Sequence, residues 1–216
     1  ETIVLTGSTY LEMLHDTPPE RTNLSLDKLY GISPESNLVS FFSAPDTNTT
    51  IAAVNSLVSL VTKLIPEHLE IIVRPHPRMA GKAKLEEASR RLRVAHYDSG
   101  DNLDTPSLLL ASKFSLSMAS TVSLESIVLG VPSAFFQVGW DYNELDSYYK
   151  NVESVLRLRT PQDFKGFVAS VCGQEESPDS ADVENYRGAL SRSWDVIRGL
   201  MDRATEDHPI SDPDDN

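Results

Sequence analysis

The chain has 216 residues, 40% of them hydrophobic and 24% charged, with a formal net charge of −13 at pH 7. This composition is typical of an ordinary globular protein with one large domain, and the strong acidity argues against a nucleic-acid-binding protein. The one cysteine, Cys172, excludes an internal disulfide framework and fits a reducing compartment. No apolar run is long enough for a membrane span, so none is predicted.

The charge is distributed unevenly along the chain. Residues 173–185 and 206–216 each carry five acidic residues and no basic one, and these ten charges leave only −3 for the rest. Between Arg74 and Arg93, seven basic residues stand against two acidic ones, a net of +5. Most of this basic segment, from Lys82 onwards, is interpreted as a solvated helix face, although it also permits an anionic small molecule to bind.

Strands and helices are predicted to alternate along the chain. A strand over 2–6 and a short helix over 10–15 precede a polar, proline-rich loop or linker at 16–27. Further strands are predicted over 37–43, 69–73, 93–97, 114–118, 131–137 and 155–157. The predicted helices run from an Asn48 or Thr49 cap to 64, over 82–92, over 106–112 after an Asp104 or Thr105 cap, over 122–129 before Gly130, from a Thr160-Pro161 cap, and over 182–203.

This alternation predicts an α/β fold, because strands separated by single helices pair in parallel through right-handed crossovers. We expect a doubly wound, mostly parallel, Rossmann-like sheet of about six strands, with helices on both faces and a long C-terminal helix. The predicted division is an interdomain strand, helix and linker at 1–30 and a Rossmann-like nucleotide-binding domain at 31–172. An acidic loop and C-terminal helix packing on that domain follow at 173–205, and a disordered acidic tail at 206–216. Because the chain begins at Glu1 with a strand-like run, we expect a fragment of a longer protein.

Ligands of such sheets bind outside the carboxyl ends of the strands, and the turn Ala119-Ser120-Thr121-Val122 lies at one of these ends. Backbone N–H groups and hydroxyls at the start of a helix suit a phosphate group. Simple helix capping by Ser120 or Thr121 is the alternative, and the two interpretations are compatible. Glu125, one turn into the helix, could accept two ribose hydroxyls or could be an ordinary exposed helix residue.

A second candidate is Val73-Arg74-Pro75-His76-Pro77. Two prolines fix the backbone around His76 directly after a buried strand. Its imidazole could donate to a phosphate or sugar oxygen, with protonation adding charge near neutral pH, and Arg74 could add a second donor. A purely structural histidine is the alternative.

These segments, with Gly130-Val131-Pro132, resemble the carboxyl-terminal half of GT-B-fold glycosyltransferases. The sequence is most similar to the CDP-glycerol glycerophosphotransferase and capsule-polysaccharide transferase group, and more distantly to UDP-GlcNAc 2-epimerase. The resemblance implies that His76 contacts the phosphate of the donor as the catalytic residue and that Ser120 and Thr121 bind its diphosphate. It further implies that Glu125 binds the ribose and that Asp98, Ser99 and Gly100 lie against the base.

The resemblance also implies a UDP- or CDP-linked donor and a missing N-terminal domain with the acceptor site, so that this fragment alone is inactive. We expect a cytoplasmic transferase, with peripheral contact at the inner face of the membrane as an option. No metal site and no cofactor are predicted, because the five histidines show no paired ligand spacing and no glycine-rich dinucleotide motif follows the first strand. The alternative from another class is a non-catalytic α/β domain that binds a nucleotide or a protein in regulation or assembly.

Overall fold

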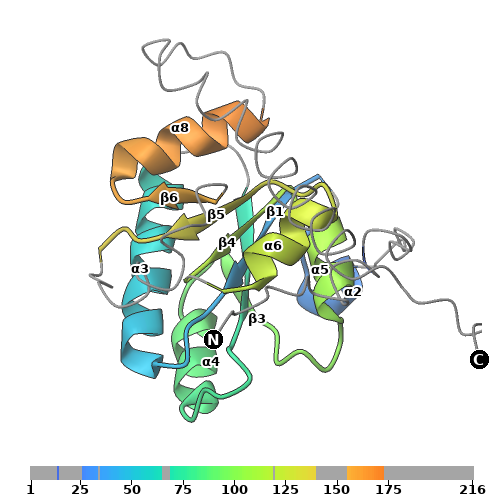
Figure 1. Ribbon diagram of the computed structural model, residues 1–216. Coiled ribbons are helices and arrows are strands. Elements are labelled where there is room, and N and C mark those ends of the chain that lie inside the picture. The colour runs from blue at the N-terminus through green and yellow to red at the C-terminus, as the bar shows by residue number, and fades with distance from the viewer. Residues whose placement is uncertain are drawn as a thin grey trace, which may run out of the picture.

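The computed structural model describes residue 14 and residues 26–33, 35–64, 69–118, 120–139 and 155–172. Within them, six parallel strands form one sheet in the order β3-β2-β1-β4-β5-β6 (Figure 1). The strands are β1 (Asn37–Phe42), β2 (Leu69–Arg74), β3 (Ala95–Tyr97), β4 (Phe114–Ser117), β5 (Ser133–Phe136) and β6 (Leu156–Leu158). The predicted α/β fold is therefore confirmed. The predicted strand over 2–6, the helix over 182–203 and the acidic tail lie outside the described residues.

Helices cover both faces of the sheet, as predicted for a doubly wound fold. On one face lie α3 (Thr47–Leu64), α4 (Lys82–Arg90) and α8 (Pro161–Cys172), and on the other lie α2 (Leu26–Tyr30), α5 (Thr105–Ala111) and α6 (Val122–Val128) (Figure 1). Successive strand residues point to opposite faces, so Val39 and Phe41 join the larger apolar cluster while Leu38 and Phe42 join the smaller one. Because both faces of the sheet are packed, the sequence of β1 is a nearly continuous hydrophobic run instead of an alternating one.

Strand register brings the carboxyl ends of the central strands level with one another. Phe42, the last residue of β1, pairs with Arg74 on β2 and with Ser117 on β4. Between β1 and β4 the strand order reverses direction, which is the position where open α/β sheets bind ligands. The residues that follow β1, β2, β3 and β4 therefore meet at one edge of the sheet.

A layer of buried serines joins β4 and β5 to α6. The hydroxyl of Ser115 lies 2.8 Å from those of Ser126 and Ser133, and Ser126 also donates to the carbonyl oxygen of Val131 at 3.0 Å. Such small side chains let the helix approach the sheet closely while their hydroxyls satisfy one another. This packing fixes where α6 begins relative to the end of β4.

Three local features test the prediction in detail. Gly130 has φ of 71° and follows the last turn of α6, which confirms it as the residue that ends this helix. The cap predicted for α3 at Asn48 or Thr49 is wrong, because Asp46 accepts the N–H of Thr49 at 2.7 Å and the helix begins at Thr47. Helix α2 has no predicted counterpart.

Candidate ligand-binding site

A cavity of about 300 Å³ opens at the carboxyl edge of the sheet, where the strand order reverses. Segments that follow four different strands line it: Phe42 and Ser43 at the end of β1, residues 74–77 at the end of β2, residues between 99 and 105 after β3, and Ser120 with Val122 after β4. Lys82, the first residue of α4, completes the lining. The cavity therefore lies where the fold predicts a ligand.

Five of the eight residues predicted for the site line this one cavity: Arg74, His76, Ser99, Gly100 and Ser120. Asp98 is fully buried and is paired with Arg74 of the lining. Thr121 is exposed and Glu125 is partly buried, and neither lies among the lining residues. The structure thus brings together residues from three separate segments and leaves Thr121 and Glu125, at the start of α6, outside the cavity wall.

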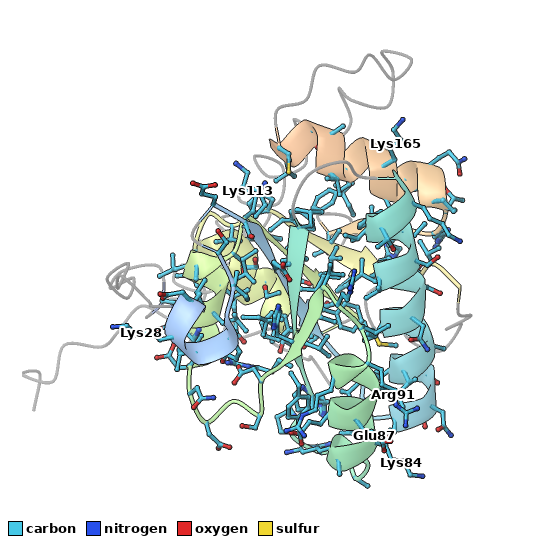
Figure 2. All side chains as sticks on the ribbon, turned by 180° about the vertical axis from the view of Figure 1, so that it is seen from behind. Lys28, Lys84, Glu87, Arg91, Lys113 and Lys165 are labelled. Atoms are coloured by element: carbon cyan, nitrogen blue, oxygen red, sulfur yellow. The ribbon has the colours of Figure 1, made fainter. Side chains whose placement is uncertain are left out.

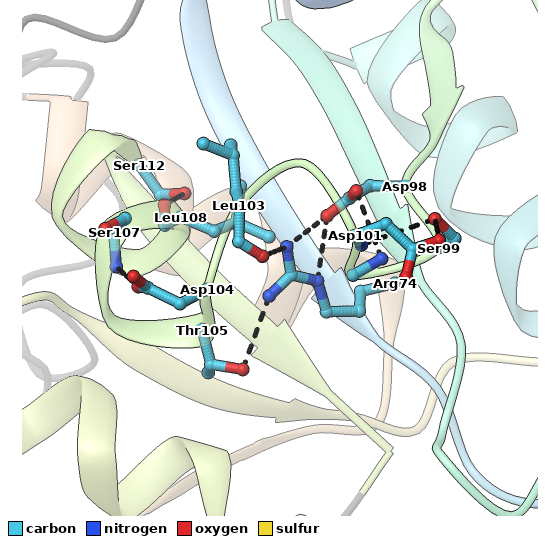
Figure 3. Close-up of polar contacts among 11 residues, drawn as sticks. Arg74, Asp98, Ser99, Asp101, Leu103, Asp104, Thr105, Ser107, Leu108 and Ser112 are labelled. Atoms are coloured by element: carbon cyan, nitrogen blue, oxygen red, sulfur yellow. Dashed lines mark hydrogen bonds and ion pairs between the residues drawn. The ribbon is translucent and has the colours of Figure 1, made fainter.

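Arg74 and Asp98 form a buried ion pair at the base of the cavity. The Nε of Arg74 donates to Oδ2 of Asp98 at 2.9 Å, and Nη2 contacts the same oxygen (Figure 3). Nη2 also donates to the carbonyl oxygen of Leu103 at 2.7 Å, and Nη1 to the hydroxyl of Thr105 at 3.3 Å. A guanidinium has five N–H donors, so four of them hold protein groups. Arg74 therefore fixes the segment between β3 and α5, with Gly100 bound to the other oxygen of Asp98 at 3.2 Å.

His76 is held by two hydrogen bonds at the end of β2. Its backbone N–H donates to the buried hydroxyl of Ser43 at 2.7 Å, and its Nδ1 accepts the backbone N–H of Arg78 at 3.1 Å. A neutral imidazole whose Nδ1 accepts a hydrogen bond carries its proton on Nε2. The ring therefore has a fixed orientation and one N–H donor available for a ligand.

The charge state of His76 differs from the expectation. Burial, followed by the positive charges of Arg78 and Lys82, lowers the pKa of His76 from its ordinary value. Since the ordinary value is about 6.5, the imidazole is neutral at pH 7. In this structure it offers a neutral N–H donor rather than the positive charge predicted from the sequence.

The start of α6 satisfies most of its own backbone donors. The hydroxyl of Ser117 accepts the N–H of Ser120 at 3.2 Å and lies 2.9 Å from the hydroxyl of Ser123, and the hydroxyl of Ser120 accepts the N–H of Val122 at 3.3 Å. The N–H groups of residues 123–125 bond to carbonyl oxygens of residues 120 and 121. The N-cap residue is Thr121, whose side chain caps no N–H group. The capping prediction is therefore confirmed only in part, by the bond that Ser120 accepts from Val122. An accepting hydroxyl keeps its own hydrogen, and Ser120 lines the cavity. The donor that this residue can offer there is therefore its O–H and not a row of helix N–H groups.

The sequence pattern pointed to three lining residues without assigning them to the site. Asp104 and Thr105 were predicted as alternative helix caps, and Asp104 does cap α5 by accepting the N–H of Ser107 at 2.7 Å. Lys82 belongs to the basic segment that was interpreted as a solvated helix face. The signal that could have identified it is its position as the first residue of the helix that follows the Arg74-Pro75-His76-Pro77 turn.

The described ranges contain no group of three His, Cys, Asp or Glu side chains in an arrangement that could hold a metal ion. None of the described helices combines the length and the apolar composition needed to cross a bilayer.

Comparisons with known proteins agree on the fold. No protein-family model matches the sequence, and no curated protein matches it. A putative UDP-N-acetylglucosamine 2-epimerase from Listeria monocytogenes is similar in structure with a TM-score of 0.55 and 15% identity, over 99% of this chain and 56% of that one. The H444N variant of the wall teichoic acid polymerase TagF, also solved after a CDPG soak, gives 0.55 and 13%, over 84% and 46% of the two chains.

A third similar structure is described as trehalose-6-phosphate from E. coli bound with UDP-2-fluoro glucose. Its TM-score is 0.55 at 12% identity, over 92% of this chain and 48% of that one. All three have the GT-B fold, so the resemblance drawn from the sequence is confirmed at the level of the fold. The chain spans about half the length of the solved structures that it matches.

Proposed function

We propose that the chain is the donor-binding part of a GT-B glycosyltransferase or glycerophosphotransferase and binds a nucleoside-diphosphate-activated donor, UDP- or CDP-linked, in the cavity at the strand-order reversal. The observation that carries this proposal is that residues singled out in three separate segments line one cavity. Two similar proteins are described with nucleotide ligands, UDP-2-fluoro glucose and CDPG, which supports this ligand class. The chain spans about half of such proteins, so the acceptor site is assigned to a further domain, and the chain alone is expected to be inactive.

The proposed roles follow from the donors that the fold leaves available. His76 directs its Nε2–H to a phosphate oxygen, and Ser120 donates its hydroxyl to the same group. As the bond between donor group and diphosphate breaks, negative charge grows on the departing phosphate oxygens, and preorganised donors stabilise that charge. Ser99 and Gly100 form the part of the wall assigned to the nucleoside. Thr121 and Glu125 remain proposed ligands of the diphosphate and ribose from the first turn of α6, reached by a donor that extends beyond the cavity.

Calorimetric titration of the chain with UDP, CDP, GDP and CMP tests the proposal. We expect one nucleoside diphosphate to bind, and we expect His76→Ala and Ser120→Ala each to weaken it. Loss of a hydrogen bond to a charged group costs about 1.5–3 kcal/mol, or roughly 10- to 150-fold in Kd. His96→Gln is the matched control, because His96 is paired with Glu70 at 2.9 Å and is not part of the cavity lining.

Two results would contradict the proposal. The first is a wild-type chain that binds none of the four nucleotides. The second is a nucleotide whose affinity is the same in wild type, His76→Ala and Ser120→Ala, since that ligand would then occupy another place. Binding that persists without any transfer activity once the upstream half is joined to the chain would favour the non-catalytic alternative.

A further inference from the structure

The charged groups of the cavity do not contribute equally to its net charge. Arg74, Lys82 and Asp104 line it, and the side chains of Arg74 and its partner Asp98 are only 8% and 0% exposed. The charges of Arg74 and Asp98 therefore cancel at the cavity base. Asp104 keeps its negative charge but is exposed to solvent, and its carboxylate caps α5 by accepting the N–H of Ser107. His76 is neutral at pH 7. Lys82 is the remaining cation of the lining.

Lys82 has no ion-pair partner in the part of the chain that the structure describes, and its side chain is partly buried in the cavity wall. Its positive charge is one of the causes that lower the pKa of His76, so the ammonium and the imidazole are electrostatic neighbours. By contrast, Lys84 on the same helix is exposed and points away from the sheet (Figure 2). Two lysines that are two positions apart thus have different environments.

The placement of Lys82 opposes the usual preference of a helix. Cations are unfavourable at a helix N-terminus, where the macrodipole is positive. Yet α4 begins with Lys82, has no acidic residue in its first turn, and receives no side-chain cap from Gly81. Departures from local preference of this kind are expected at functional sites.

Gly81 explains how the start of α4 comes so close to the neighbouring helix. A Cβ atom at this position would lie 2.4 Å from Oγ1 and 2.7 Å from Cγ2 of Thr47, the first residue of α3. Only glycine permits this approach without movement of Thr47. At the other end of the first turn, Leu85 is fully buried in the core. Together these contacts hold Lys82 at the carboxyl edge of the sheet.

We propose that Lys82 is the residue that neutralises the diphosphate of the ligand, and that Arg74 is a positioning residue that shapes the cavity. This inference rests on the proposed function and adds to it a charged ligand residue on a segment that the site prediction did not include. A diphosphate carries more negative charge than the two neutral donors of His76 and Ser120 can match, and an ammonium group supplies a mobile point charge for it. A nucleoside without phosphates makes no use of Lys82.

Titration of the full 216-residue chain with UDP and UMP, and with CDP and CMP, tests this assignment. Lys82→Gln is expected to weaken the diphosphates about tenfold, near the lower limit for a charge-assisted contact because Lys82 is partly exposed. The monophosphates should be weakened less, and Lys82→Arg should retain most of the affinity. Lys84→Gln is the matched control, since it removes the same charge from the same helix, and it should bind as wild type does.

A stability measurement separates lost binding from misfolding. Lys82→Gln removes a cation from a helix N-terminus, so its Tm should equal or slightly exceed that of wild type. Weaker binding together with unchanged or higher Tm supports the assignment. If Lys82→Gln binds the diphosphates as tightly as wild type does, the assignment is overturned. If His76→Ala nevertheless binds them more weakly, the proposed function is left intact.

The two proposals fail in distinguishable ways. A wild-type chain that binds no nucleotide contradicts the proposed function. Titration with inorganic pyrophosphate then tests separately whether Lys82 binds a diphosphate group. Pyrophosphate that binds to wild type and Lys84→Gln but more weakly to Lys82→Gln supports the charge-neutralising role. Equal binding in all three, or no binding to wild type, overturns it.

Discussion

The two walls of the cavity are built by different chemistry. On the side of β2 and β3, a buried guanidinium and a buried carboxylate join the strand ends through Arg74 and Asp98. On the side of β4 and α6, the end of the strand is joined to the start of the helix by uncharged hydroxyl groups, those of Ser117, Ser120 and Ser123. We name these the ionic wall and the hydroxyl wall.

The difference shows that a charged side chain beside a ligand site does not always bind the ligand. In the ionic wall, four of five guanidinium donors bind protein atoms, and burial with the nearby Asp98 carboxylate raises the pKa of the Tyr30 phenol to about 12. That phenol therefore stays neutral and adds no charge beside the pair. In both walls the donors left for a ligand are few, and the functional proposals rest on those.

The largest difference between the walls should appear when one partner of the ion pair is removed. Asp98→Ala leaves the guanidinium of Arg74 buried without its counter-charge, which should lower the free energy of unfolding by about 3–5 kcal/mol. Urea denaturation measures this loss. The double variant Arg74→Met with Asp98→Leu should be markedly more stable than Asp98→Ala, because it removes both charges and keeps apolar volume.

An exposed ion pair provides the control for this experiment. Glu86→Gln breaks the pair with Arg90 on α4, where the two side chains are 36% and 77% exposed, and its cost should stay below about 1 kcal/mol. If Asp98→Ala costs no more than Glu86→Gln, the description of the ionic wall as a buried, stabilising pair is wrong.

The fold was largely predictable because its signals are local. The strands are marked by short apolar runs and the longer helices by helical periodicity, and single-helix connections between strands imply parallel pairing. The cap of α3 was misplaced because four successive residues, 46–49, can all cap a helix, and only the backbone path decides which one does. Helix α2 was missed because five residues are too few to show a helical period.

The site was predictable only where its residues belong to a recognisable turn. His76 and Ser120 stand next to proline or small-residue turns after buried strands, and the chain geometry then brings them into one cavity. The pairing of Arg74 with Asp98, 24 positions apart, depends on the register of β2 and β3 and leaves no local signal. Lys82 was hidden in a basic segment that also contains exposed residues such as Lys84, which points away from the sheet.

A smaller effect should distinguish two serines of the hydroxyl wall. Ser117→Ala removes the acceptor of the Ser120 N–H and the partner of Ser123, which should lower the free energy of unfolding by about 1–3 kcal/mol. Because Ser120 then loses its support, nucleoside diphosphate affinity should fall between about twofold and tenfold, the range for one net hydrogen bond. Denaturation and calorimetry measure the two effects.

Ser123→Ala is the matched variant for Ser117→Ala. It removes the hydroxyl pair but leaves the bond between Ser117 and the N–H of Ser120 in place. Stability should therefore fall while affinity stays near that of wild type. Equal losses of affinity in both variants would mean that Ser117 does not act on the ligand site through Ser120.

The smallest expected effect is the pH dependence that comes from His76. Its pKa in the folded chain lies below the ordinary value of about 6.5, so between those two values the unfolded chain binds more protons. This histidine therefore lowers stability as pH falls through that window and has no effect on stability above it. A bound diphosphate adds negative charge beside the ring and should raise the pKa of His76. Binding then takes up protons, so affinity should rise as pH falls from about 8 toward 6.5, by less than about tenfold per unit, which is the limit for one proton.

NMR titration of the His76 ring, with and without diphosphate, measures both pKa values directly. In Lys82→Gln without ligand, the pKa of His76 should move back toward its ordinary value, because the positive charge of Lys82 that helps to lower it is gone. His76→Gln should lose the rise in affinity between pH 8 and 6.5, which assigns that rise to this ring. A diphosphate that leaves the pKa of His76 unchanged would show that the phosphate lies away from the imidazole. The donors of the hydroxyl wall would then have to hold the ligand without it.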